Sequence, residues 1–264
     1  MESSQTFWQH LDALRGVLVR MGVTVFVAVV ALFVAMPSVF DYVVLWPCRA
    51  DFPLYRLFDI GRGWFERLAG PGAVESAQTP EALSLININL GSQLMVQMSM
   101  SVHMALILTF PLLVYMLWGF VSPGLYPREK RNATRAFVFA NIMFYIGVAV
   151  GYFLVFPLTL RFLSQYQLSQ TIVNTLTLDS YIDNFLIITM LMGAVFELPL
   201  LAWLLGKAGV LTRSFFGKYR RHAVVALLVV AALITPTGDP LSLAIVFVPL
   251  YLLWESSAWL VRSR

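Results

Sequence analysis

Charged residues are scarce in this chain, and their scarcity excludes the ordinary soluble classes of protein. Only 12% of the 264 residues are Asp, Glu, Lys or Arg, whereas 59% are hydrophobic. A soluble globular domain carries roughly 25% charged residues, and a soluble chain of this length could not hide so much apolar surface. The composition therefore predicts a membrane protein before any motif is considered.

Cysteine is nearly absent, and so are the short motifs of common catalytic sites. Cys48 is the only cysteine, so no intramolecular disulfide can form, and zinc-ligand spacings do not occur. A glycine-rich nucleotide loop, HExxH and GxSxG are all missing. Ser99 and His103 could suggest an intramembrane enzyme, but no base, nucleophile and orienting group can be assembled around them. We therefore expect neither enzymatic activity nor a cofactor or metal.

Six apolar segments predict an all-α, polytopic membrane protein built as one domain. The first four reach the roughly 20 residues that a spanning helix needs. The last two are short and flank a turn rich in proline and glycine at residues 236–240. They predict a short helical hairpin, with a single re-entrant hairpin as the alternative. The predicted spans are residues 16–36, 94–120, 136–162, 181–205, 223–235 and 241–259.

The distribution of basic residues predicts that both termini are cytoplasmic. Lys and Arg gather before the first span, in the loops after the second and fourth spans, and at the end of the chain. The long loop 37–90, predicted on the outer side, has four arginines outnumbered by six acids. Residues 62–68 within it suggest a short interfacial helix. A cleaved signal peptide is the alternative for the first apolar run, but the helical pattern just before it favours a retained span.

The segment before the first span predicts an amphipathic helix on the cytoplasmic side. Phe7, Leu11 and Leu14 recur at helical spacing on one face. Asp12 and Arg15 bring charge to the same segment. The alternative is a simple anchor helix.

One acid stands out in the loop between the second and third predicted spans. Glu129 is the only acid there, among four basic residues, and it follows the rigid Pro123-Gly124 turn. A carboxylate can bind the planar guanidinium of an arginine through two hydrogen bonds. Glu129 is therefore a candidate for binding an arginine-bearing peptide, and the alternatives are a helix-start acid or a local salt bridge.

Three further acids lie in or near the apolar segments. Glu197 lies within the fourth predicted span, where a charged side chain costs on the order of 3 kcal/mol on insertion scales. Asp239 lies in the turn of the short hairpin, and Glu255 lies near the inner end of the last span. The alternatives are a protonated Glu197 hydrogen-bonded inside the bundle, a turn or cap role for Asp239, and solvation of Glu255 beside Arg262.

Six motifs in one order resemble the TatC family of the twin-arginine protein translocase. Each motif alone is weak, but together they cover nearly the whole chain. Ala13 stands where the family usually has an acid, with Asp12 beside it. The motifs are Phe7 with HLDALR at 10–15, FVSPGLY at 120–126 followed by Glu129 and Arg131, GYFLVFP at 151–157, FELP at 196–199, RR at 220–221, and TP at 235–236 followed by Asp239, Pro249-Leu250 and Glu255.

The resemblance implies a receptor and scaffold in the bacterial inner membrane, which exports folded proteins with the proton-motive force. It implies two kinds of protein partner, which are twin-arginine signal peptides and single-span subunits of the TatA and TatB type. Membrane lipid and further copies of the chain are also expected as partners, and nucleic acid is not. The implied signal-peptide residues are Glu129, Asp12, Leu11, Leu14, Arg15 and Pro123, and the implied intramembrane polar or partner-docking residues are Glu197, Asp239, Glu255 and Tyr152.

A different class of function competes with this interpretation. In a proton- or ion-coupled transporter of small solutes, Glu197 would be the coupling site. That hypothesis predicts transport by the purified chain alone, whereas the receptor hypothesis predicts a requirement for partners.

Overall fold

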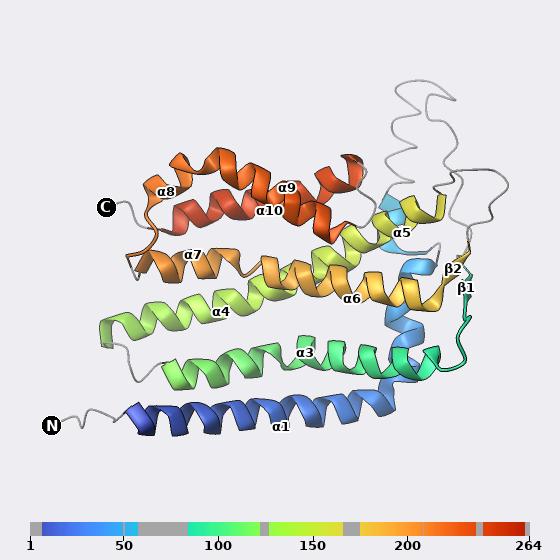
Figure 1. The fold of residues 1–264 in the computed structure, drawn as a ribbon, viewed down its shortest axis with the longest axis horizontal. Coiled ribbons are helices and arrows are strands. Elements are labelled where there is room, and N and C mark those ends of the chain that lie inside the picture. Colours follow the sequence, from blue (N-terminus) through green and yellow to red (C-terminus); the bar gives the residue numbers. More distant parts are fainter. Residues whose placement is uncertain are drawn as a thin grey trace.

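The computed structural model describes residues 7–49, 51–57, 84–121, 127–165, 175–207, 209–235 and 240–261, and nearly all of them are helical. Long helices lie side by side in one stack, with a helical hairpin on top (Figure 1). The elements are α1 (Phe7–Val39), η1 (Phe40–Val44), η2 (Trp46–Cys48), β1 (Leu85–Ile86), α3 (Ser92–Val121), α4 (Pro127–Val150), η4 (Gly151–Val155), α5 (Phe156–Gln165), β2 (Leu176–Thr177), α6 (Leu178–Val195), α7 (Leu198–Lys207), α8 (Arg213–Lys218), α9 (Arg220–Ile234) and α10 (Pro240–Leu260).

Four helical stretches of the described chain are long and apolar enough to cross a membrane. This follows from their length and composition, and it fits the prediction of a helical membrane protein. The predicted interfacial helix at 62–68 lies outside the described residues. The four stretches are Leu11–Leu57, Ser92–Phe120, Ala136–Ser164 and Leu178–Lys207.

The last two helices differ in length. The 21 residues of α10 span about 31 Å at the usual helical rise, so the prediction that both helices are short is wrong for α10, and only α9 is short. The 15 residues of α9 span about 22 Å at the usual helical rise, whereas the hydrocarbon core of a bilayer is about 30 Å thick. In Figure 1 the hairpin ends before it reaches the edge at which α3 and α6 meet the small sheet of β1 and β2. Two membrane crossings by this hairpin remain a prediction.

A proline lies inside each of the helices α1 and α3, and a neighbouring helix compensates for the hydrogen bond that is lost in each case. Pro37 lies inside α1, so the helix continues to Val39, past the residue at which the sequence predicted the first span to end. A proline cannot donate to the carbonyl four residues before it, which leaves the Phe33 carbonyl without its helical partner. Gln97 of α3 donates its side-chain amide to this carbonyl at 2.9 Å.

The same compensation occurs within α3. Pro111 lies inside this helix and frees the carbonyl of Ile107. The Tyr145 hydroxyl of α4 donates to it at 3.1 Å. Because hydrocarbon supplies no water to satisfy a free carbonyl, these side chains make helix-internal prolines tolerable and set the pairing of α1 with α3 and of α3 with α4.

A double-mutant cycle tests the bond between Gln97 and the Phe33 carbonyl. We expect Gln97→Leu to lower the free energy of unfolding by about 1 kcal/mol, since a part-buried carbonyl loses its donor. In a Pro37→Ala background the backbone N–H returns, so the same substitution should cost much less. Thermal unfolding of the four purified proteins in detergent gives the coupling. Equal costs in both backgrounds would show that Gln97 acts through packing alone.

Glycines let α4 and α6 approach closely. A Cβ atom built on Gly147 would lie 2.5 Å from the Met192 carbonyl oxygen and 2.7 Å from the Phe196 Cβ. A Cβ on Gly193 would lie 2.9 Å from ring and methyl atoms of Phe144 and Val148. Small residues at such crossings allow the close helix packing that stabilises membrane bundles.

The Gly147 contact gives a second stability prediction, with a control in the same protein. Gly147→Ala should destabilise the protein by about 1–3 kcal/mol, because the backbone of α6 must move. Gly119 in α3 has open space around its Cβ position, so Gly119→Ala should be neutral or stabilising. Apparent Tm values of both variants in one detergent test this. A Gly147→Ala protein as stable as Gly119→Ala would contradict the packing argument.

Candidate functional site

The N-terminal segment forms the start of a long helix. Helix α1 begins at Phe7 and continues without interruption into the first apolar stretch. Leu11 is 40% exposed, Asp12 and Arg15 are exposed, and Leu14 is half-buried. One apolar and two charged side chains are thus accessible within about one and a half helical turns. A peptide that has a charged part and an apolar part could bind to such a surface.

Glu129 lies in the first turn of α4, two residues after Pro127 begins the helix. Proline suits the first position of a helix, and an acid in the first turn interacts favourably with the helix dipole. Helix start and peptide binding are therefore compatible roles for this residue. The side chains of residues 127–133 and the whole of Pro123 lie outside the described part of the chain.

The starts of α1 and α4 lie at the same end of the stack (Figure 1). The end of α3 and the end of α7 are at this end as well. The structure therefore brings the backbone of Asp12 and the backbone of Glu129, far apart in the sequence, to one end of the protein.

Glu197 lies in a break between two helices. Pro199 follows it at the second position of α7 and cannot donate to the carbonyl of Val195, so the helix is interrupted there. The Glu197 N–H bonds to the Ala194 carbonyl in a tight turn, and the Leu201 N–H bonds to the Glu197 carbonyl as the helix resumes. The sequence therefore determines this break locally.

Both carboxylate oxygens of Glu197 are buried, and no described residue hydrogen-bonds to them. The alternative of a carboxyl group hydrogen-bonded inside the bundle finds no partner among the described residues. Because an unpaired polar group in an apolar setting is costly, this side chain is the least satisfied polar group among the described residues of the candidate site.

Glu255 is paired within the chain. Its carboxylate lies 2.7 Å from the Arg220 guanidinium and accepts a bond from the Tyr251 hydroxyl at 2.9 Å. Arg220 Nε in turn donates to the Tyr251 hydroxyl at 2.8 Å. This three-residue cluster joins the first turn of α9 to α10. The sequence placed Glu255 beside Arg262, which lies outside the described residues, as does Asp239.

Tyr152 has an internal role as well. Its hydroxyl donates to the Val43 carbonyl at 2.6 Å, and the Tyr181 hydroxyl donates to the next carbonyl, Val44. Both acceptors belong to the irregular turn η1, where the chain leaves α1. Two tyrosines from η4 and α6 thus satisfy carbonyls that a distorted helix end leaves free.

A polar contact at the opposite end of the stack was missed from the sequence. Asp179, in the first turn of α6, accepts a hydrogen bond from Asn89 at 3.0 Å and another from the Ser92 hydroxyl. Beside it, β1 pairs in parallel with β2. An acid after a capping threonine signals a helix start, but nothing local identifies partners about 90 residues away.

Comparisons with known proteins decide the family. The model of the family described as Sec-independent protein translocase protein (TatC) matches residues 9–249. The chain belongs to the TatC family. A TatC from Deinococcus radiodurans is 35% identical over 184 residues, which cover 70% of this chain and 68% of the relative. A TatC from Blattabacterium is 28% identical over 259 residues, covering 98% and 96%.

Solved structures agree with the family. A crystal structure of the twin-arginine translocase receptor TatC in the detergent DDM has a TM-score of 0.71 and 25% identity, and the match covers 96% of this chain and 99% of that one. The chain is thus a membrane protein and a non-enzymatic component of a Sec-independent protein translocase, whose partners belong to the same translocation system. The expectation from the sequence motifs is confirmed at this level.

Proposed function

We propose that this chain is the receptor of a twin-arginine translocase and binds signal peptides at the end of the stack where α1 and α4 begin. The observation that supports this most is that α1, which carries Asp12 and the accessible Leu11, and α4, which carries Glu129 in its first turn, begin at the same end of the stack (Figure 1). Acids would bind the paired arginines, and Leu11 and Leu14 would contact the apolar part of the peptide. Arg15 and Pro123 would shape the same site.

The proposal includes a topology. The chain crosses the bacterial inner membrane six times, and both termini and the peptide site face the cytoplasm. The excess of Lys and Arg in the loops at that end supports this orientation. The short helix α9 thins the bilayer locally, because a span shorter than the membrane must be accommodated by lipid, tilt or partners.

Glu197 supports a second part of the proposal. Its buried carboxyl group without a described partner would accept a hydrogen bond from the transmembrane helix of a TatA- or TatB-type subunit. Glu255 is less suited to this role, because Arg220 and Tyr251 already occupy its carboxylate. The assembled complex uses the proton-motive force to export folded proteins.

Peptide binding to the purified chain in nanodiscs tests the receptor function. A peptide with two adjacent arginines should bind about fivefold more tightly, or better, than the same peptide with two lysines, because only guanidinium makes paired bonds to a carboxylate. Measurement at fixed low and high salt separates this geometry from general charge attraction. Equal affinities for both peptides would contradict the proposed recognition.

The buried Glu197 also favours one other function, that of an ion-coupled transporter of small solutes. Flux into vesicles containing only the purified chain, driven by a pH gradient, distinguishes the two. The receptor proposal expects no flux above that of empty vesicles.

A further inference from the structure

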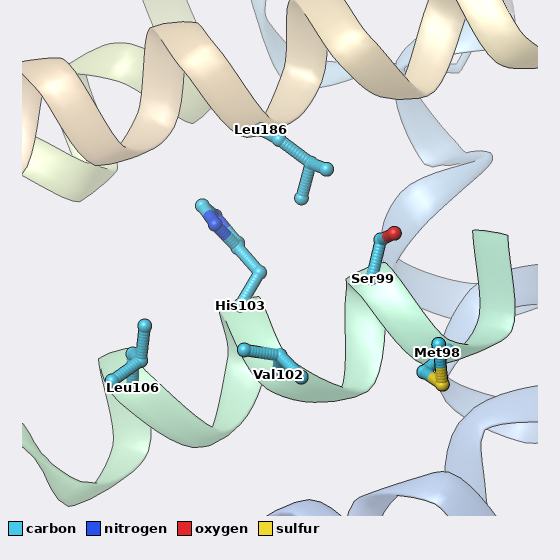
Figure 2. A pocket seen from close by; sticks show the side chains of 6 residues that line it. All are labelled: Met98, Ser99, Val102, His103, Leu106 and Leu186. Atoms are coloured by element: carbon cyan, nitrogen blue, oxygen red, sulfur yellow. The ribbon is translucent and has the colours of Figure 1, made fainter. Parts of the chain in front are cut away.

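A pocket of about 370 Å³ lies between α3 and α6 (Figure 2). Helix α3 contributes most of its wall, and Leu186 of α6 points into it from the other side. Both helices are candidate membrane spans, so the pocket lies at the depth of the bilayer. Four lining side chains are apolar, and two, Ser99 and His103, are polar. The lining residues are Met98, Ser99, Val102, His103, Leu106 and Leu186.

The hydrogen bonds of His103 determine which ring nitrogen remains available. His103 is only 6% exposed, and its Nε2 lies 2.8 Å from the Thr189 hydroxyl oxygen. That hydroxyl donates its single proton to the Phe185 carbonyl at 2.6 Å, so Nε2 must be the donor to Thr189. In a neutral imidazole Nδ1 is then an acceptor, and no described residue donates to it.

An acceptor at this depth restricts the chemistry of an occupant. Lipid chains carry no hydrogen-bond donor, and the hydrocarbon region holds no water to supply one. A protein helix that brings a serine, threonine, asparagine, glutamine or tryptophan side chain can donate to Nδ1. The pocket is at the small end of ligand-sized cavities, so it accommodates one or two side chains while the rest of the helix lies across its mouth.

The position of the pocket relative to Glu197 indicates the same occupant. Leu186 lies in α6, and Glu197 follows two residues after the end of this helix. Their separation of eleven residues corresponds to roughly 16 Å of helical rise. A transmembrane helix that lies along α6 and reaches Glu197 also passes the pocket.

We propose that this pocket receives a donor side chain from the transmembrane helix of the single-span partner subunit that docks at Glu197. The inference rests on the proposed partner docking and adds a second, specific contact to it. His103 is the acceptor, Ser99 one turn away offers a further hydroxyl, and the apolar wall surrounds the inserted side chain.

Disulfide crosslinking in membranes tests the proposal. In a Cys48→Ala background, Ser99→Cys should crosslink to cysteines placed along the transmembrane helix of a co-expressed TatA- or TatB-type subunit. Leu108→Cys is the control, because Leu108 is an exposed residue of α3 about 140° around the helix from His103. Adding His103→Leu should reduce the Ser99→Cys crosslink about three- to tenfold, as loss of one hydrogen bond implies.

Each other outcome overturns the proposal. Equal crosslinks from Ser99→Cys and Leu108→Cys, or no effect of His103→Leu, would show that the pocket is not a specific contact. Crosslinks between two copies of this chain would assign the face to self-association, and the absence of any protein crosslink would assign it to lipid. Glu197→Cys, run in parallel, separates the cases: if it crosslinks to the partner and Ser99→Cys does not, only the pocket proposal fails.

Discussion

Glu129→Arg is expected to abolish signal-peptide binding and export, and this is the largest effect that we predict. The substitution removes the only acid between the second and third predicted spans, residues 121–135, and adds a fifth basic residue there, so the paired arginines of the peptide meet repulsion. An exposed ion pair contributes only about 0.2–1 kcal/mol, whereas charged hydrogen bonds contribute about 1.5–3 kcal/mol. We therefore expect Glu129→Gln to weaken binding about tenfold and Glu129→Arg to weaken it further.

The measurement is the affinity of a twin-arginine peptide for the protein in nanodiscs at fixed salt. Val210→Arg is a suitable control, because Val210 is exposed between α7 and α8 and the substitution adds positive charge without touching the proposed site. A peptide in which an acid replaces one arginine should bind Glu129→Arg better than the natural peptide does. Unchanged affinity in Glu129→Arg would remove this residue from the site and leave Asp12 as the candidate acid.

Glu197→Ala is expected to separate partner binding from the stability of the isolated chain. The buried carboxyl group has no described partner, so removing it relieves an unsatisfied polar group worth about 1–3 kcal/mol. The purified variant should therefore unfold at the same temperature or a few degrees higher. Copurification and crosslinking of the single-span subunits, and export, should be lost, while signal-peptide binding is retained.

Asp183→Ala provides the control for this experiment. Asp183 is an exposed acid on the same helix, α6, and its removal should change neither stability nor partner binding. If Glu197→Ala lowers the apparent Tm and leaves partner binding and export intact, Glu197 is a structural residue of the bundle and the docking proposal is wrong.

Helix positions were predictable from the sequence because they depend on local properties. Apolar runs and turn-forming residues indicated the long helices, and α3 (Ser92–Val121) differs from the predicted 94–120 by two residues or fewer at either end. The sequence predicted one continuous span at 181–205, although Pro199 accounts for the break that the structure shows at Glu197. Pro37 led to an error of the opposite kind, because the sequence predicted that the first span ends before it, whereas α1 continues to Val39. A proline ends a helix unless something else satisfies the freed carbonyl, and Gln97, which does so here, is 60 residues away in the sequence.

The candidate site was predictable in its residue types but not in its pairings. Sequence motifs identified Glu129, Glu197 and Glu255 as acids worth testing. They did not indicate that Glu255 would pair with Arg220 and accept a hydrogen bond from Tyr251. Nor did they indicate that the Tyr152 hydroxyl would donate to a backbone carbonyl. Asp179 and Thr189 went unnoticed because each is an ordinary polar residue of a helix until its partner is known.

By itself, the sequence determined that this protein is a helical membrane protein of the TatC family, because composition, hydrophobic runs and ordered motifs are properties of the chain. Only the tertiary structure decided which acids are satisfied and which are not. That outcome depends on how each helix is rotated and against which helix it packs, and the packing is set by long-range contacts such as those of Gly147 with α6 and of Gln97 with α1. Glu197 is therefore left without a described partner, whereas Glu255, which is also a glutamate in a predicted span, has two partners.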